Sequence, residues 1–145
     1  MFKIHHIENS HSSAPDIHSL GAAVGEYVPG MPLVVANGVL TPITTATTKP
    51  THICAVQKNI KNAGDALPVF SVSHDIVFEV DAVHSADPAA IVDGTALTLE
   101  IANSKATGNV TDVKTNGVVT VYNKLEASAS PAASSKETIL VKIKC

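Results

Sequence analysis

The sequence predicts a small all-β protein, and three features of the chain support that fold class. Apolar residues make up 45% of the 145 residues, whereas aromatic residues make up only 3% and Trp is absent. The core must therefore consist of Val, Ile, Leu and Ala, and β-branched residues fit a pleated sheet better than a helix. Two Asn-Gly pairs lie between apolar segments, and several segments alternate apolar with polar residues. We therefore expect a small antiparallel β-barrel or sandwich.

The two Asn-Gly pairs each predict a β-hairpin, because both residue types accept the positive φ of a two-residue turn. The first pair is Asn37-Gly38, and the second, which has the clearer flanking strands, is Asn116-Gly117. The strands expected to pair are residues 33–36 with 39–41, and residues 110–114 with 118–122.

Three further segments alternate with the period of two that is typical of half-buried strands. They are residues 76–80, 97–101 and 139–143, and the last is expected to tie the end of the chain into the sheet. Residues 87–94 predict a single helical turn, with Asp87 as its N-cap and Gly94 as its stop. The whole pattern predicts seven or eight short strands and at most one helical turn.

Residues 1–22 differ from the rest of the chain, and we expect an N-terminal arm there. Their polar residues alternate poorly with apolar ones and show no helical period, which predicts a loosely ordered segment. Residues 23–145 are expected to form the β-rich domain. Residues 127–135, ASASPAASS, predict a flexible loop within it.

Charge and hydropathy argue against several classes of partner. All ten basic residues are Lys, and the formal net charge is −3, so the chain lacks the basic footprint and the Arg clamps of nucleic-acid and phosphate binding. No apolar run approaches the ~20 residues of a membrane-spanning helix, and the N-terminus lacks the apolar stretch of a signal peptide. We therefore expect no nucleic acid, no membrane, and a cytoplasmic place of synthesis.

The histidines are the best candidates for a chemical site, because neutral imidazole binds Zn²⁺, Ni²⁺ or Cu²⁺. Their spacing matches no standard ligand template, however, and no motif for catalysis or nucleotide binding is present. We therefore expect no metal, no cofactor and no catalytic residue. The four histidines in the expected arm are His5, His6, His11 and His18.

Other polar residues have simpler interpretations. His74-Asp75 resembles a base and its orienting acid, but the nearby Ser71 and Ser73 give no defined nucleophile, and neighbouring strand residues point to opposite faces. Cys54 is expected to be a small buried hydrophobic residue, and Cys145 an exposed thiol. Four carboxylates have no calcium-loop spacing and are expected to be solvated at strand ends, namely Glu79, Asp81, Asp87 and Asp93.

The order of these elements is similar to that of the head decoration (cement) proteins of tailed bacteriophages. The similarity spans roughly residues 24–144 and lies in the residue pattern and the order of the segments rather than in a diagnostic motif. The segments that carry it are VPGMPL at 28–33, GVL at 38–40, LPV at 67–69, DIVFEV at 75–80, GTALTL at 94–99 and NGVVTV at 116–121.

This resemblance implies a virion structural protein that is not an enzyme. Members of the family bind the outside of an expanded capsid, bridge neighbouring major capsid subunits and often form trimers, with the N-terminal arm on the capsid. The alternative is a surface or fibre-base β-domain for adhesion to a host or ligand. A small, enzyme-like protein that binds a metal or ligand is the third interpretation.

Overall fold

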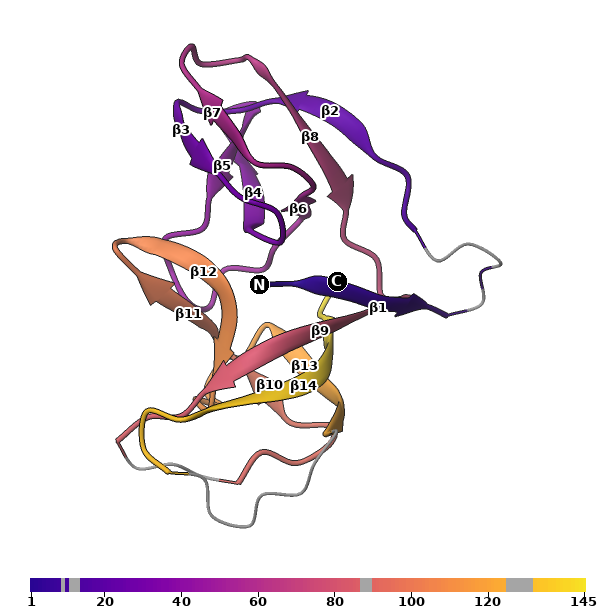
Figure 1. Cartoon of the computed structure of the whole chain (residues 1–145), viewed down its shortest axis with the longest axis vertical. Helices are drawn as coiled ribbons and strands as arrows, with labels where there is room; N and C mark the ends of the chain where they lie inside the picture. Colours follow the sequence, from indigo (N-terminus) through magenta and orange to yellow (C-terminus); the bar gives the residue numbers. More distant parts are fainter. Residues whose placement is uncertain (9, 11–13, 87–89, 125–131) are drawn as a thin grey trace.

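The computed structural model of the chain describes residues 1–8, 10, 14–86, 90–124 and 132–145. Every helix or strand found in these ranges is a β-strand, and the strands form two lobes with the N-terminal strand between them (Figure 1). The all-β fold class is therefore confirmed. In the same ranges, no helix is long and apolar enough to span a bilayer.

The larger lobe is one sheet with the strand order β10-β13-β14-β9-β12-β11. Its longest strands, β9 and β14, pair antiparallel from Val83 opposite Lys136 to Phe78 opposite Val141. Both strands bury the predicted residues Phe78, Val80, Ile139 and Val141, but Val77 and Leu140 on the opposite face are buried as well. The sheet has seven strands, because β1 (Lys3–Ile7) pairs with β9 beside this order. The other six are β9 (Ile76–Val83), β10 (Ala96–Leu97), β11 (Leu99–Ala102), β12 (Lys105–Thr111), β13 (Val119–Lys124) and β14 (Lys136–Ile143).

This sheet rolls into a nearly closed barrel. Its two end strands, β10 and β11, are consecutive in the chain and are separated only by Thr98. The Thr98 N–H donates to the Val113 carbonyl at 3.0 Å, and the Thr111 N–H donates to the Thr98 carbonyl at 2.9 Å. The strand predicted over residues 97–101 is thus divided, because its first part pairs with β13 and its second part with β12. One pairing in the barrel, β12 with β9, is parallel.

The smaller lobe is a five-stranded sheet with a two-stranded ribbon beside it. Its order is β2-β8-β6-β4-β5, and its outer strands approach each other where Ala22 forms a parallel bridge with Leu40. The strands are β2 (His18–Gly21), β4 (Pro32–Ala36), β5 (Val39–Pro42), β6 (His52–Cys54) and β8 (Ala66–Ser71), and the ribbon is β3 (Gly25–Tyr27) with β7 (Lys58–Ile60). Buried Tyr27 and Ile60 fix the ribbon against the core of this lobe.

The core of the barrel extends into the smaller lobe. Ile53 of β6 and Phe70 of β8 belong to the same buried cluster as the inward side chains of the barrel. The Phe70 and Phe78 rings stack with their centroids 6.3 Å apart, and Phe2 meets Phe78 edge to face at 5.4 Å. Three phenylalanines therefore join the two lobes, although aromatic residues are rare in the chain.

The first predicted hairpin is confirmed. Strands β4 and β5 pair from Ala36 opposite Val39, and the turn residues Asn37 and Gly38 have φ values of 51° and 80°. Both central residues are thus in the left-handed region that a type I′ turn requires.

The second predicted hairpin is wrong. Strand β12 pairs with β9 and β11, whereas β13 pairs with β10 and β14. Only Asn116 has positive φ, and Gly117 instead packs against the backbone of Ala96 and Leu97. The Val118 N–H donates to the Leu97 carbonyl, so residues 96–98 occupy the place of the expected partner strand.

The expectation of a loosely ordered arm also differs from the structure. Strand β1 (Lys3–Ile7) pairs antiparallel with β9, and β2 pairs with β8. Phe2 is only 3% exposed. The segment is ordered despite its weak alternation. Pairing with β9 and β8 satisfies its backbone hydrogen bonds, and the buried side chain of Phe2 anchors it. The domain boundary between residues 22 and 23 stays a prediction.

Several other expectations concern short or irregular segments. The structure contains more strands than the predicted seven or eight, because strands of two to four residues such as β3, β7 and β10 are too short to show a period. Asp87 lies outside the described residues, as does most of the predicted flexible loop. Gly94, the expected stop of the helical turn, has a φ of 81° and lies in a turn, and the described residues 90–93 before it are not helical.

Candidate functional site

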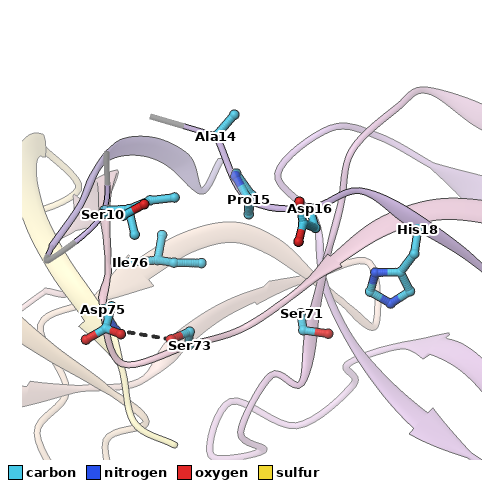
Figure 2. A pocket seen from close by; sticks show the side chains of 10 residues that line it. Ser10, Ala14, Pro15, Asp16, His18, Ser71, Ser73, Asp75 and Ile76 are labelled. Carbon is cyan, nitrogen blue, oxygen red and sulfur yellow. Dashed lines mark hydrogen bonds between the residues drawn. The ribbon is translucent and has the colours of Figure 1, made fainter. Parts of the chain in front are cut away.

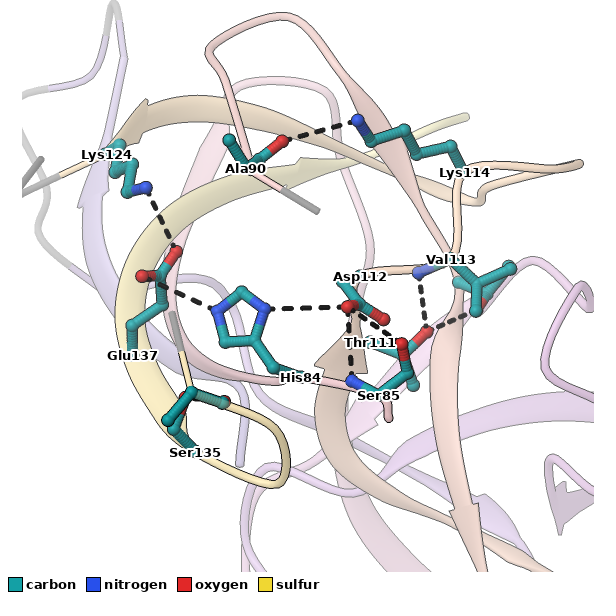
Figure 3. A network of polar contacts seen from close by, with 12 residues as sticks. His84, Ser85, Ala90, Thr111, Asp112, Val113, Lys114, Lys124, Ser135 and Glu137 are labelled. Carbon is teal, nitrogen blue, oxygen red and sulfur yellow. Dashed lines mark hydrogen bonds and ion pairs between the residues drawn. The ribbon is translucent and has the colours of Figure 1, made fainter. Parts of the chain in front are cut away.

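The most unusual polar group of the molecule is a buried cluster at one end of the barrel, centred on His84 (Figure 3). The His84 side chain is completely buried, and that of Asp112 is 3% exposed. Glu137, on the opposite side of the imidazole, is 18% exposed. A buried charged group is rare unless it is paired, so the partners of each atom matter.

Strand periodicity brings these three residues together. His84 continues the inward-facing series Ile76, Phe78, Val80 and Ala82 of β9 by one step. In the same way, Asp112 follows inward-facing Val110, and Glu137 precedes inward-facing Ile139, Val141 and Ile143. Because β12 and β14 pair with β9 beside Val83, the three polar side chains form one layer at the end of the barrel.

Each imidazole nitrogen faces a carboxylate. His84 Nδ1 lies 3.6 Å from Asp112 Oδ2, and Nε2 lies 3.6 Å from Glu137 Oε2. Lys124 Nζ lies 3.4 Å from the other Glu137 oxygen. The backbone of His84 is also fixed, because its N–H donates to the Ser135 carbonyl and its carbonyl accepts from the Ser134 N–H. The cluster thus connects β9, β12, β13 and β14.

Asp112 is held as a carboxylate by the residues around it. Burial alone would raise its pKa, but the Ser85 N–H and hydroxyl both donate to Oδ2 at 3.1 Å, and His84 lies beside it. These contacts outweigh burial, so the pKa of Asp112 lies below its usual value.

The geometry of this cluster does not match a catalytic triad. Ser85 donates its hydroxyl proton to Asp112 rather than to His84, so the imidazole is not placed to activate that hydroxyl. The His84 side chain also has no exposed surface. The cluster can instead act as a polar clamp that closes the end of the barrel and links four strands.

The structure places the histidines of the expected arm on two different strands. His5 and His6 lie on β1, where their Nδ1 atoms are 2.7 Å apart. His18 lies on β2 and meets His52 of β6 edge to face, with 5.8 Å between ring centroids. Burial, and then the neighbouring His18, lowers the pKa of His52. His11 lies outside the described residues.

The other expected candidates have ordinary surroundings. His74 Nε2 lies 3.2 Å from Asp75 Oδ1, but the His74 side chain is 80% exposed and the pair is a surface contact. Asp81 accepts a hydrogen bond from Thr138, and Asp93 accepts one from the Lys124 N–H. Within the described ranges, no group of three His, Cys, Asp or Glu residues has the geometry of a metal site.

The two cysteines are placed as expected. Cys54 is buried, its thiol donates to the Val56 carbonyl, and Cys145 is exposed. Burial raises the pKa of Cys54, although the hydrogen bond to Val56 opposes this, so the thiol remains protonated near neutral pH. A protonated buried thiol is a poor nucleophile.

A groove of about 470 Å³, with both polar and apolar residues in its lining, lies where the N-terminal segment passes between the two lobes (Figure 2). Asp16, His18 and Ser71 lie along one part of it, and Ser73 and Asp75 along another. The hydrogen bond drawn in the groove runs from the Asp75 N–H to Ser73 Oγ. The groove has the volume for a small polar ligand.

A second, more apolar pocket of about 230 Å³ lies nearby. Phe2, Ile17, Pro29 and Phe70 contribute to its walls. The two pockets share Ala14 and Pro15, so the N-terminal segment forms part of both.

Sequence reasoning did not identify the His84 cluster. A signal was nevertheless present: extending the period of two beyond Val80 places Ala82 and then His84 on the inward face. The same extension, backward from Ile139, reaches Glu137. What the sequence did not reveal is that β9 ends and β14 begins at the same end of one barrel.

Comparison with known proteins does not assign a family. No protein-family model matches the chain, and no curated protein matches it significantly.

Proposed function

We propose that this protein decorates the outer surface of a bacteriophage capsid and stabilises it by bridging major capsid subunits. The order of its sequence segments is similar to that of head decoration proteins, and its fold is all-β. On this proposal the protein is not an enzyme, and it resides on the virion exterior after synthesis in the host cytoplasm.

The observation that carries the proposal is the presence of exposed large apolar side chains on both lobes. Bridging requires two separate contact surfaces on one scaffold, and exposed apolar side chains supply contact area. The smaller lobe exposes Val24, Val28 and Val35, and the barrel exposes Val92, Val113 and Tyr122. Val24 and Val35 are 63% and 45% exposed, and Val92 and Val113 are 57% and 47% exposed.

The connection between the lobes suits this role. The stacked rings of Phe70 and Phe78 and the buried Phe2 fix one lobe against the other, so force applied at one contact surface reaches the other. Many copies that each bridge two subunits would together oppose the pressure of packaged DNA through multivalency. We expect trimers at local threefold positions.

The test uses purified protein and expanded capsids that lack it. Wild-type protein should co-sediment with the capsids and raise their thermal stability. Val24→Asp with Val35→Asp, and separately Val92→Asp with Val113→Asp, should each weaken binding by roughly tenfold. Thr47→Asp places the same charge at an exposed polar turn and should bind like wild type.

The outcomes separate the proposal from its alternative. Loss of binding in only one pair of variants would contradict bridging and favour a single contact surface. No binding by wild-type protein to capsids, together with binding to host cells or glycans, would overturn the proposal in favour of an adhesion domain. In that case the groove beside Asp16 and His18 is the first place to search for the ligand.

A further inference from the structure

The adjacent histidines of β1 lie at a β-bulge. Ile4 pairs with Phe78 and His6 pairs with Val77, so two steps along β1 correspond to one step along β9. His5 is the extra residue. In a regular strand, neighbouring side chains point to opposite faces, whereas a bulge reorients one of them. The bulge explains how the His5 and His6 rings meet at all.

The two rings present the same type of nitrogen to each other. Their Nδ1 atoms lie 2.7 Å apart and their centroids 5.0 Å apart, with 72° between the ring planes. One Nδ1 donates and the other accepts, so both rings direct Nδ1 toward a common point.

His6 is held in position by its neighbours on the barrel. Its ring meets the Tyr122 ring edge to face at 5.9 Å, and the Lys142 ammonium lies 5.1 Å from the centroid of Tyr122. Lys142 also pairs with Glu8, which follows β1. This hydrogen bond, followed by one with Tyr122, lowers the pKa of Glu8 and keeps it anionic. A ring that its neighbours already hold in position loses less conformational entropy when it binds a ligand.

The distance between the two Nδ1 atoms is close to the distance between two nitrogen ligands of one metal ion. Metal–nitrogen bonds of about 2.0–2.1 Å place two neighbouring imidazole nitrogens about 2.9–3.3 Å apart. A small rotation of the exposed His5 ring converts the observed 2.7 Å contact into that arrangement. Imidazole nitrogen suits Cu²⁺, Ni²⁺ and Zn²⁺, and the Irving–Williams order makes Cu²⁺ the tightest of the three.

We propose that His5 and His6 form a two-imidazole site that binds a divalent transition-metal ion, Cu²⁺ most tightly. Both rings bind through Nδ1 once the donating ring has moved its proton from Nδ1 to Nε2, and water fills the remaining coordination positions. The sequence predicted no metal site because the histidine spacing matches no standard ligand template, and the sequence does not show the bulge that brings the two rings together. The proposal does not depend on the capsid function.

The first experiment locates the ion without changing either histidine. Wild-type protein and Cys145→Ser, which lacks the exposed thiol, are titrated with CuSO₄ and NiCl₂ by calorimetry and by ¹H–¹⁵N NMR. We expect about one equivalent of Cu²⁺ to bind in both proteins, with paramagnetic broadening centred on residues 4–8 and Tyr122. Broadening centred on His18 and His52 would overturn the proposal.

The second experiment removes the ligands one at a time. His5→Gln and His6→Gln should each weaken Cu²⁺ binding at least roughly tenfold. His74→Gln removes a histidine that is 80% exposed and should leave binding unchanged. Circular dichroism of each variant verifies folding. Unchanged Cu²⁺ affinity in a folded His5→Gln, His6→Gln double variant would contradict the site.

Discussion

At the scale of single residues, the barrel is distinguished by the polar layer that closes one end of it. A buried imidazole between two carboxylates contributes little net stability when desolvation is counted, but removing one member leaves the others unpaired. Asp112 is the best-connected member, since it accepts two hydrogen bonds from Ser85 and faces His84. We therefore expect the cluster to be more sensitive to loss of one charge than any surface pair.

Replacing Asp112 with Asn should destabilise the protein in a pH-dependent way. The folded-state pKa of Asp112 lies below the unfolded value of 3.8, so its stabilising contribution is complete above that value. This contribution is lost as pH falls through the lower, folded-state pKa. We expect Asp112→Asn to lower the free energy of unfolding by about 1–3 kcal/mol at pH 7. The difference from wild type should shrink at pH 3, as measured by urea denaturation.

Asp75→Asn provides the control for this measurement. Asp75 also faces a histidine, but its side chain is 38% exposed and the pair is on the surface. Exposed ion pairs contribute about 0–1 kcal/mol, so the variant should remain close to wild type at both pH values. An Asp112→Asn effect of the same size at pH 3 and pH 7 would contradict the electrostatic role of Asp112.

At the scale of elements, the sequence predicted strands better than it predicted their partners. The alternation in residues 76–80 and 139–143 identified β9 and β14, because alternate residues of each strand lie in the barrel core, although Val77 and Leu140 on the other face are buried too. The Asn37-Gly38 turn also identified its hairpin. By contrast, Asn116-Gly117 has the same local preference, yet the strand that follows it, β13, pairs with the backbone of Ala96 and Leu97 and not with β12. Pairing between distant segments is not encoded in a dipeptide.

The two glycines give a direct test of this difference. A Cβ at Gly117 would lie 2.4 Å from the Ala96 carbonyl carbon, whereas a Cβ at Gly38 has no such neighbour. Gly38 instead has a φ of +80°, a backbone conformation that is strained for a residue with a side chain. Gly117→Ala should lower the free energy of unfolding by about 3 kcal/mol, and Gly38→Ala by about 1 kcal/mol.

Chemical denaturation of both variants measures this comparison. The larger effect at Gly117 follows from backbone packing, because the Ala96 and Leu97 atoms cannot rotate away as a side chain could. A smaller effect at Gly117 than at Gly38 would mean that the Asn116 turn forms an ordinary hairpin.

At the scale of the whole molecule, the chain is two lobes with one continuous core. Sequence composition limited the fold to an all-β protein, and the missing Trp correctly indicated a core rich in aliphatic residues. It did not indicate two lobes, because the contacts that join them involve Phe2, Phe70 and Phe78 from separate segments. The candidate cluster at His84 depends on the same long-range closure, which explains why its three residues appeared unrelated in the sequence.

Phe70 is the residue with which to test whether the two lobes unfold together. It belongs to β8 of the smaller lobe, is 6% exposed and stacks on Phe78 of the barrel. Phe70→Ala should destabilise the protein by about 3–5 kcal/mol, and Val35→Ala, at an exposed position, by less than about 0.5 kcal/mol. Because the core is shared, amide exchange in Phe70→Ala should accelerate equally in β4 and in β14. Faster exchange in β4 alone would mean that the lobes unfold independently and that a load on one lobe does not reach the other.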